Sequence, residues 1–378
     1  MRGTLTYTHT KYWQEECNVR IFIVGMGTIG EPLANLFLEF HKCLGITEII
    51  IHKNTPDPQC RGMLKRSCEK GARLAVYREH RGAFEAMLAP VGVAPTYNFE
   101  EALDAADVVI DCTAEKIGRK LKETWYGQHA GTAKRFIAQG SEKGFGMPYA
   151  FNINDEALTP DVQFIQAVSC NTHQILCVLK TFAQLGFLPQ YGSIAQARFV
   201  IFRRASDISQ TNSIVGVEGS EPVCDIYGSH QGEDAMRVLK TMGITHLDLH
   251  TRALKANNSF MHVVEFYITL TQRVSRDEII GLFRKNPLTP VTYRKTSNEV
   301  FAQGRDWGHF GRILNQTVVS LPLLEVKGQE IYGTCFTPQD GNALLSSVAA
   351  TLFFRNPETY RKEVMQHFGQ MLNMFAEV

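Results

Sequence analysis

The sequence predicts an α/β fold in two domains, a parallel sheet with helices followed by an α+β unit with a mainly antiparallel sheet. The chain has 378 residues, which is more than one hydrophobic core usually contains. In its first half, short apolar runs alternate with helix-like stretches, as in a parallel sheet. From about residue 195 the apolar runs are longer and richer in β-branched and aromatic residues, which favours antiparallel strands. We therefore expect a first domain over residues 1–169, completed by 336–378, and a second over 170–335.

The elements of the first domain follow one another in order along the chain. Apolar runs predict strands at residues 19–24, 48–52, 108–112, 135–139 and 162–168. The stretches between them predict helices at residues 32–40, 84–88 and 99–106. Residues 61–70 are basic and are interpreted as an insertion, and residues 1–16 as an added strand or an ordered arm.

The second half contains fewer but longer elements. Residues 197–202 and 263–271 are expected to be strands of the second sheet. Ser275 and Glu278 have the spacing of a capping box, so a helix is expected over residues 275–283. Residues 344–378 have a helical pattern and are expected to return to the first domain.

Composition and charge exclude several classes of function. The apolar fraction of 44% and the charged fraction of 20% are those of a soluble globular protein. A net charge of +1 gives no reason to expect nucleic acid or an acidic membrane as a partner. No apolar run reaches the roughly 20 residues that cross a bilayer. The nine cysteines are scattered without the spacing of a zinc site, so we expect reduced thiols, no metal and a cytoplasmic location.

The strongest local motif is a glycine-rich turn. Gly25, Gly27 and Gly30 follow the first predicted strand and open a helix, with Thr28 and Ile29 between them. In a dinucleotide-binding turn the first glycine permits a tight bend, the second lets the backbone approach a pyrophosphate, and the third lets helix and strand pack closely. The helix N-terminus then offers N–H groups to the phosphate. The context favours a Rossmann domain over a turn without a ligand.

The end of the second predicted strand bears on which dinucleotide binds. An NAD site usually has Asp or Glu there, to bind the ribose hydroxyls. Here the residues include Lys53 and Asn54, with no carboxylate until Asp57. A lysine and an amide suit a 2′-phosphate instead. We therefore expect NADP, or both NADP and NAD, unless Lys53 is only a solvated loop residue.

Cys170 is the candidate nucleophile. It follows an apolar run and precedes a helical stretch at residues 175–182. A cysteine at a helix N-terminus has its thiolate stabilised by the helix dipole, and the thiolate is the form that attacks an aldehyde carbon. Taken alone, a cysteine before a helix is more often structural.

A series of motifs resembles those of the archaeal-type (class II) glyceraldehyde-3-phosphate dehydrogenases, from about residue 19 onward. The matching segments, in chain order, are residues 25–30, 53–56, 107–118, 139–143 with 151–152, 169–172, 203–207, 229–232 and 260–262. Among them, Ser169-Cys-Asn-Thr172 resembles the family's nucleophile motif, and Phe260-Met-His262 the motif with the general base.

The resemblance implies an activity and a set of roles. The activity is the reversible, phosphorylating oxidation of glyceraldehyde 3-phosphate to 1,3-bisphosphoglycerate by a cytoplasmic homotetramer. Cys170 would form the thiohemiacetal and thioester, and His262 would act as the base. Residues implied to bind the substrate or phosphate are Ser169, Asn171, Thr172, Arg203, Arg204 and His230. Residues implied to bind NADP or NAD are Gly25, Gly27, Thr28, Ile29, Gly30, Lys53, Asn54, Thr113, Gln139 and Gly140.

Simpler interpretations stay open for several of these residues. His262 lies between Met261 and Val263 and would otherwise be taken for a core histidine. Arg203 and Arg204 are adjacent on a strand and point to opposite faces, so at least one of them would pair with a carboxylate.

The chain departs from the family pattern at three places. His173-Gln174 replaces a Thr-Gly pair whose threonine helps bind phosphate, so His173 is expected to bind an anion or to alter the pKa of Cys170. Gln231 replaces a histidine of the family. The family's asparagine that orients the nicotinamide is expected near Ser347, where this chain has serines. Two alternatives therefore remain, a dehydrogenase of another aldehyde or semialdehyde and a non-catalytic nucleotide-binding redox sensor.

Overall fold

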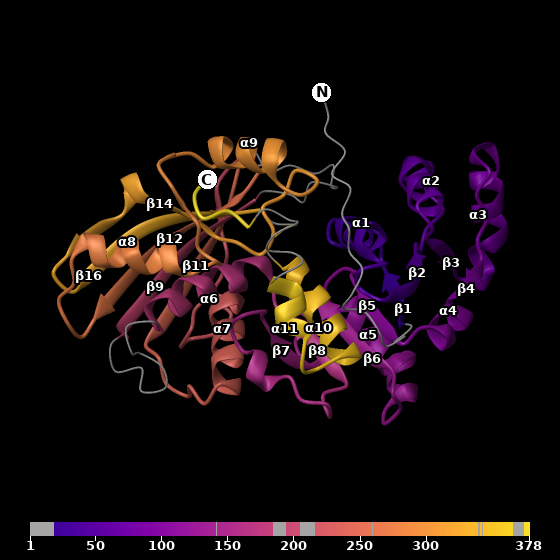
Figure 1. Cartoon of the computed structure of the whole chain (residues 1–378), viewed down its shortest axis with the longest axis horizontal. Helices are drawn as coiled ribbons and strands as arrows, with labels where there is room; N and C mark the ends of the chain where they lie inside the picture. Colours follow the sequence, from indigo (N-terminus) through magenta and orange to yellow (C-terminus); the bar gives the residue numbers. More distant parts are fainter. Residues whose placement is uncertain are drawn as a thin grey trace.

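A computed structural model describes residues 19–140, 142–183, 194–204, 216–258, 260–338, 341, 343–365 and 374–378 (Figure 1). The arm expected at residues 1–16 lies outside the described residues. Two sheets organise the rest, the first at the right of Figure 1 and the second at the left. No helix among the described residues is long and apolar enough to cross a membrane.

The first sheet has eight strands, and all of its neighbours are parallel. Its strands are β1 (Val19–Val24), β2 (Ile46–His52), β3 (Arg73–Val76), β4 (Tyr97–Asn98), β5 (Val108–Asp111), β6 (Arg135–Gln139), β7 (Met147–Tyr149) and β8 (Phe164–Ala167). Their order is β4-β3-β2-β1-β5-β6-β8-β7, so the chain moves outward from β1 and then returns to its other side. Ligands bind at such a reversal, beyond the carboxyl ends of the strands. The parallel sheet confirms the predicted Rossmann-like half.

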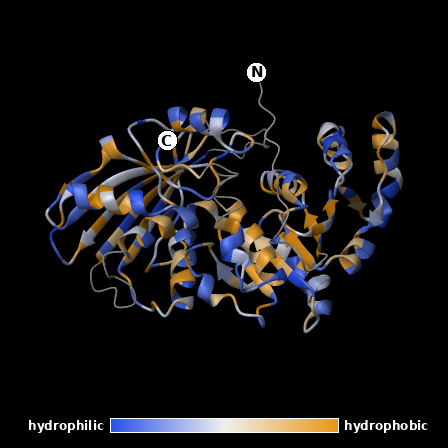
Figure 2. Ribbon diagram, in the orientation of Figure 1, coloured by the Kyte–Doolittle hydropathy of each residue, from blue (hydrophilic) through white to orange (hydrophobic). Residues whose placement is uncertain are grey.

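Helices cover both faces of this sheet because its strands are apolar on both sides. They are α1 (Gly30–Phe40), α2 (Arg61–Glu69), α3 (Arg81–Leu88), α4 (Phe99–Ala105) and α5 (Ile117–Thr124). Side chains of α1, α2 and α3 join one core with Ile21 and Ile23, whereas α4 and α5 pack with Phe22 on the other face. Figure 2 shows hydrophobic residues gathered in the strands and blue on the outer faces of the helices. Residues 61–70, interpreted as an insertion, form the crossover helix between β2 and β3.

The second sheet also has eight strands but mixes both directions. Its strands are β9 (Ile194–Arg204), β10 (Glu218–Gly219), β11 (Leu249–Ala256), β12 (His262–Leu270), β13 (Val291–Thr292), β14 (Val318–Ser320), β15 (Glu325–Lys327) and β16 (Glu330–Thr337). Antiparallel pairing joins β9, β12, β16 and β14, as predicted. The pairs β11–β9 and β13–β14 are parallel and the other pairs are antiparallel, so the sheet is mixed and the expected antiparallel character is confirmed in part.

Helices on the second sheet form a separate core. They are α6 (Cys170–Ala183), α7 (His230–Thr241), α8 (Arg276–Lys285) and α9 (Ser297–Trp307). The first three pack on β9 and β12 through residues such as Leu176, Met236 and Phe283. Ser275 and Glu278 form the predicted capping box of α8.

The last segment of the chain contacts both cores. Helix α10 (Leu344–Arg355) packs into the core of the first sheet beside β6 and β8, and α11 (Tyr360–Glu363) follows it. The helical expectation fails at the end, because residues 374–378 are not helical. There the backbone N–H of Val378 donates to Val291 O at 2.8 Å, next to β13. Backbone pairing with a strand takes the place of the helix.

Candidate active site

A cavity of about 450 Å³ lies where the carboxyl ends of the first sheet meet the start of α6. Its lining includes eight residues that the sequence singled out: Gly27, Thr28, Ile29, Thr113, Gln139, Gly140, Ser169 and Cys170. Cys112, Ala114, Glu115, Val168 and Ala343 complete it. The glycine turn and the candidate nucleophile therefore face one space, although they are far apart in the sequence.

The glycine turn has a tight backbone with open space beside its middle glycine. Gly25 has a φ of +94° and donates its N–H to His52 O at 3.1 Å. A Cβ on Gly30 would lie 1.8 Å from Gly25 O, so only glycine lets α1 begin this close to the turn. A Cβ on Gly27 would meet no atom within 4 Å, because it would stand in the open space at the cavity. The turn is thus a cradle that a side chain would fill.

Thr113 is held at the cavity by a buried carboxyl group. Its backbone N–H and its hydroxyl both donate to Asp111 Oδ1, at 2.9 and 2.5 Å. Tyr126 Oη donates to Asp111 Oδ2 at 2.8 Å. Burial raises the pKa of Asp111, while these donors act to lower it. The sequence pattern did not single out Asp111; its signal was a carboxylate at the carboxyl end of a buried strand.

Cys170 occupies the first position of α6 and lines the cavity. Ser169 caps the helix, with Thr172 N–H 3.3 Å from Ser169 Oγ and the two hydroxyl oxygens 2.9 Å apart. The helix dipole favours negative charge at this sulfur. The side chains of Asn171 and Thr172 are buried and do not line the cavity.

His173 corrects an expectation, because it is not placed to bind an anion. Its ring is 1% exposed, with Nδ1 3.1 Å from Ser169 O and Nε2 2.7 Å from Ser346 Oγ. A carbonyl only accepts, so Nδ1 carries the proton and Nε2 accepts from the serine hydroxyl. Burial lowers the pKa of His173 to about 4. The ring is a neutral link between α6 and α10.

His262 is buried at the start of β12, and it does not line the cavity. Its Nδ1 accepts the backbone N–H of Arg204 at 3.2 Å. In the neutral ring the proton is therefore on Nε2. Burial, with the charges of Arg204 and Arg203, lowers the pKa of His262 to about 3. The ring is neutral near pH 7 and presents an N–H donor at Nε2.

Basic groups gather near the start of α7. Burial lowers the pKa of His230 to about 4, and the positive charges of Arg203 and Lys143 add to this effect. Lys143 forms an ion pair with Glu233, and Arg203 Nη2 donates to Ser220 Oγ at 3.1 Å. The Nε of Arg203 is buried without a hydrogen-bond partner. This cluster of Lys143, Arg203 and His230 is suited to an anion, and Lys143 is its member that the sequence pattern left without a role.

The other residues that the sequence analysis named do not line the cavity. Lys53 and Asn54 follow β2, and Asn54 O accepts from His80 Nδ1 at 2.8 Å. Gln231 is 1% exposed in α7. Ser347 is fully buried in α10 and accepts from Gln139 Nε2, so it touches the cavity only through Gln139. Ala343, just before α10, is the residue of that segment that lines the cavity.

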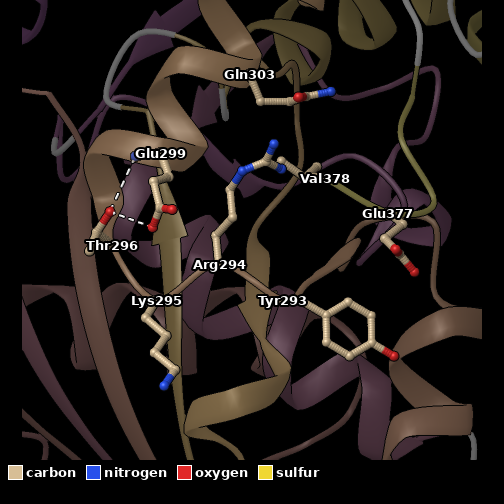
Figure 3. Close-up of a pocket in the computed structure, with 8 residues that line it drawn as sticks. All are labelled: Tyr293, Arg294, Lys295, Thr296, Glu299, Gln303, Glu377 and Val378. Atoms are coloured by element: carbon tan, nitrogen blue, oxygen red, sulfur yellow. Dashed lines mark hydrogen bonds between the residues drawn. The ribbon is translucent and has the colours of Figure 1, made fainter.

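A second cavity, of about 740 Å³, lies at the start of α9 and has a different character (Figure 3). Arg294 and Lys295 line it together with Glu299 and Glu377, so its charges are of both signs. Figure 3 shows Arg294 extending past the end of the chain toward Gln303. None of the residues expected to bind substrate or cofactor lines it.

The described residues contain no group of three His, Cys, Asp or Glu side chains placed to hold a metal.

Several curated proteins similar to this chain share one name. No protein-family model matches the chain. It is 27% identical over 326 residues to a glyceraldehyde-3-phosphate dehydrogenase of Metallosphaera sedula, covering 83% of this chain and 86% of the relative. The enzyme of the same name from Pyrobaculum calidifontis is 29% identical over 326 residues, with the same coverage. That of Sulfolobus acidocaldarius is 27% identical over 331 residues, covering 83% and 85%. The chain is thus a distant relative of archaeal glyceraldehyde-3-phosphate dehydrogenases along most of its length, which supports an oxidoreductase.

Proposed function

We propose that the chain is an NAD(P)-dependent dehydrogenase that oxidises glyceraldehyde 3-phosphate and transfers the acyl group to inorganic phosphate, which gives 1,3-bisphosphoglycerate. One observation carries the proposal: Cys170, at a helix N-terminus, shares a cavity with the glycine turn that opens α1. The names of the relatives support the substrate.

The residues present fit a nicotinamide dinucleotide. The open space at Gly27 admits a pyrophosphate, and the N-terminus of α1 faces it with its N–H groups. Thr113, Gln139 and Gly140 line the path from this turn toward Cys170. When bound, the dinucleotide supplies the acceptor for the hydride that leaves the aldehyde carbon. The chain's own residues do the remaining work.

Cys170 attacks the aldehyde carbon as a thiolate, and the carbonyl oxygen gains a proton to give a thiohemiacetal. His262 is the proposed acceptor of the hydroxyl proton as the thiohemiacetal becomes a thioester. A neutral imidazole with a proton on Nε2 accepts only at Nδ1, which Arg204 N–H now occupies. The step therefore requires this bond to open. Phosphate then attacks the thioester carbon, which releases the acyl phosphate and regenerates the thiolate.

The cluster of Lys143, Arg203 and His230 is the proposed phosphate-binding region. Arg203 has a planar fork of donors suited to phosphate oxygens, and its Nε has no partner in the structure. The α7 N-terminus at His230 adds its partial positive charge. Ser169, Asn171, Thr172 and Arg204 remain proposed contacts of the substrate or phosphate.

A second candidate function is the oxidation of another aldehyde or semialdehyde at the same thiol. The sequestered ring of His173 favours it, because both of its nitrogens are used within the fold and cannot replace a phosphate-binding threonine. A substrate with one anionic group fewer would suit such a site. The homotetramer and the cytoplasmic location remain predictions.

The deciding experiment follows the reduction of NADP or NAD by absorbance, with glyceraldehyde 3-phosphate, in the presence and absence of inorganic phosphate. We expect phosphate-dependent turnover that Cys170→Ala abolishes. Cys177→Ala is the matched control, because this thiol lies on the same helix but is buried away from the cavity. Turnover that ignores phosphate would favour the second candidate. Cofactor binding without turnover on any aldehyde would overturn both in favour of a sensor.

A further inference from the structure

The basic cluster of Lys143, Arg203 and His230 has a carboxylate of its own. Glu233 lies in the first turn of α7, the helix that begins at His230. Its Oε2 lies 2.5 Å from Lys143 Nζ. Within the described part of the chain, the Glu233 carboxylate forms no other hydrogen bond or ion pair. An acidic side chain thus occupies the lysine of a cluster that is otherwise suited to an anion.

The charges of Lys143 and Glu233 act on the same neighbouring groups. Burial lowers the pKa of His230 to about 4, and the charge of Lys143 adds to this effect while that of Glu233 opposes it. Burial raises the pKa of Asp234, which the charge of Lys143 acts to lower and that of Glu233 to raise further. Glu233 therefore offsets part of the positive field that Lys143 provides inside the cluster.

The ion pair is open enough to water to break and form again. The side chains of Lys143 and Glu233 are 38% and 34% exposed. Water screens such a pair, so opening it costs little free energy. The buried pair of Arg355 and Glu363 differs, because its side chains are 9% and 11% exposed and a charge left alone there would be costly.

The loop that bears Lys143 is fixed to α7 by other contacts. Asp234 Oδ1 accepts from Arg237 Nη1 at 3.2 Å, and the same Nη1 donates to Gln166 Oε1 at 3.1 Å. Gln166 Nε2 in turn donates to Gly140 O at 2.8 Å, at the start of the loop. The ion pair is therefore not needed to hold the loop, and the lysine can change partner while the backbone stays in place.

We propose that Glu233 competes with a phosphate group for Lys143 and so sets the affinity of this cluster for its anion. The inference rests on the proposed function, which places the phosphate of the substrate, or inorganic phosphate, at the cluster. A phosphate has about twice the charge of a carboxylate and can bind Lys143 and Arg203 together, so it displaces Glu233. A neutral ligand gains nothing by opening the pair. Glu233 is thus a specificity-determining residue.

The test measures the binding of two probes to the full chain by titration calorimetry. The probes are glycerol 3-phosphate, which has no aldehyde to react, and inorganic phosphate. We expect Glu233→Gln to bind at least one of them about fivefold more tightly than the wild type, because the amide no longer competes for the lysine. A gain for glycerol 3-phosphate assigns the cluster to the phosphate of the substrate, and a gain for inorganic phosphate alone assigns it to the free ion.

Unchanged or weaker binding of both probes by Glu233→Gln would overturn the proposal, since it would show that the ion pair serves only the structure. Neither probe is oxidised, so the binding result and the proposed activity can fail separately. Turnover with unchanged binding would leave the activity standing, and tighter binding without turnover would leave the competition for Lys143 standing.

Two further variants show whether Glu233 acts through the lysine. In a Lys143→Gln background, Glu233→Gln should give no gain in affinity, because no ammonium group remains to compete for. A gain that persisted there would mean that Glu233 acts only through its long-range charge, and would overturn the competition. Glu69→Gln is the matched control, because it removes the same charge from the exposed ion pair with Lys65 on α2, and it should change either affinity less than about twofold.

Discussion

At the scale of single residues, His173 links two helices rather than serving the reaction. Phe151 N–H donates to Ser346 Oγ at 3.0 Å, and the serine hydroxyl donates onward to the His173 ring. The ring donates to Ser169 O, one residue before the nucleophile. Each buried polar group in this series is satisfied by the next, so loss of one leaves another unpaired.

We expect His173→Ala to lower the free energy of unfolding by about 2–4 kcal/mol, because it leaves a cavity and an unpaired serine. Urea denaturation of His173→Ala, Ser346→Ala and the double variant measures the coupling. The two effects should fall short of additivity by about 1 kcal/mol or more. Additive losses would mean that the bond between the ring and the serine contributes nothing.

His262 makes a prediction about pH. With a pKa held at about 3 by burial and two arginines, its ring stays neutral through the usual assay range. We expect kcat/KM between about pH 5 and about pH 8 to show no inflection that belongs to this ring. The measurement compares the wild type with His262→Asn. An acidic limb near pH 6 that vanished in the variant would show that His262 keeps an ordinary pKa in the free enzyme.

The sequence predicted the residues of the site better than their contacts. The glycines and Cys170 are predictable because turn and helix-start chemistry depend on local sequence. Asp111 and Lys143 act through neighbours distant in the sequence, so local patterns carry little signal for them. His173 shows the limit most clearly, because its anion-binding expectation ignored Ser346, which lies 173 residues away.

At the scale of elements, two glycines of the turn between β1 and α1 have different roles. Gly30 allows close packing of the helix, and Gly27 leaves space for a ligand. A Cβ on Gly30 would lie 1.8 Å from Gly25 O, whereas one on Gly27 would meet nothing. We expect Gly27→Ala to unfold like the wild type but to bind NADP at least tenfold more weakly. Gly30→Ala should lose about 1–3 kcal/mol of stability through the backbone shift it forces. Denaturation and calorimetry on both variants test the pair, and wild-type affinity in Gly27→Ala would exclude this turn as the phosphate site.

Element boundaries followed local signals where these were strong. The capping box at Ser275 and the apolar run of β1 placed their elements correctly, because a helix cap and a buried strand are defined by adjacent residues. The helix over residues 61–69 was not predicted, because the basic composition of this segment masks the apolar face of Met63 and Leu64. The helical pattern of residues 344–378 broke down where backbone pairing with Val291 takes over.

At the scale of the whole molecule, the parallel direction of the first sheet was predictable from alternating elements, but the mixture in the second was not. The β9–β11 pair is parallel because the chain crosses over through α7 before β11. That choice depends on packing of α7 against α6 and β11, which no local pattern encodes. The cavity is lined by turns of the first sheet and by the start of α6, which packs on the second sheet. Its shape therefore depends on how the two sheets are arranged.

Buried histidines from both halves make the stability of the whole fold sensitive to acid. The pKa of His52 is held at about 3, mainly by burial, against about 6.5 in the unfolded chain. Between these values the unfolded chain binds a proton that the native chain does not, so stability falls as the pH drops below about 6.5. Buried carboxyls with raised pKa values, such as Asp111 and Asp234, act in the opposite direction. A variant difference is therefore needed to isolate the histidine.

His52→Phe supplies that difference, because the ring sits among Phe22, Tyr77 and Phe99 and its nitrogens have no partners to lose. We expect the variant to be at least as stable as the wild type at pH 7. Its advantage should grow by about 1.4 kcal/mol per pH unit below about pH 6.5 and stay constant above. Urea denaturation at several pH values measures it, with His246→Phe at an exposed position as the control. A constant difference from about pH 5 to about pH 7 would mean that the native fold admits the charged His52 ring among these aromatic side chains.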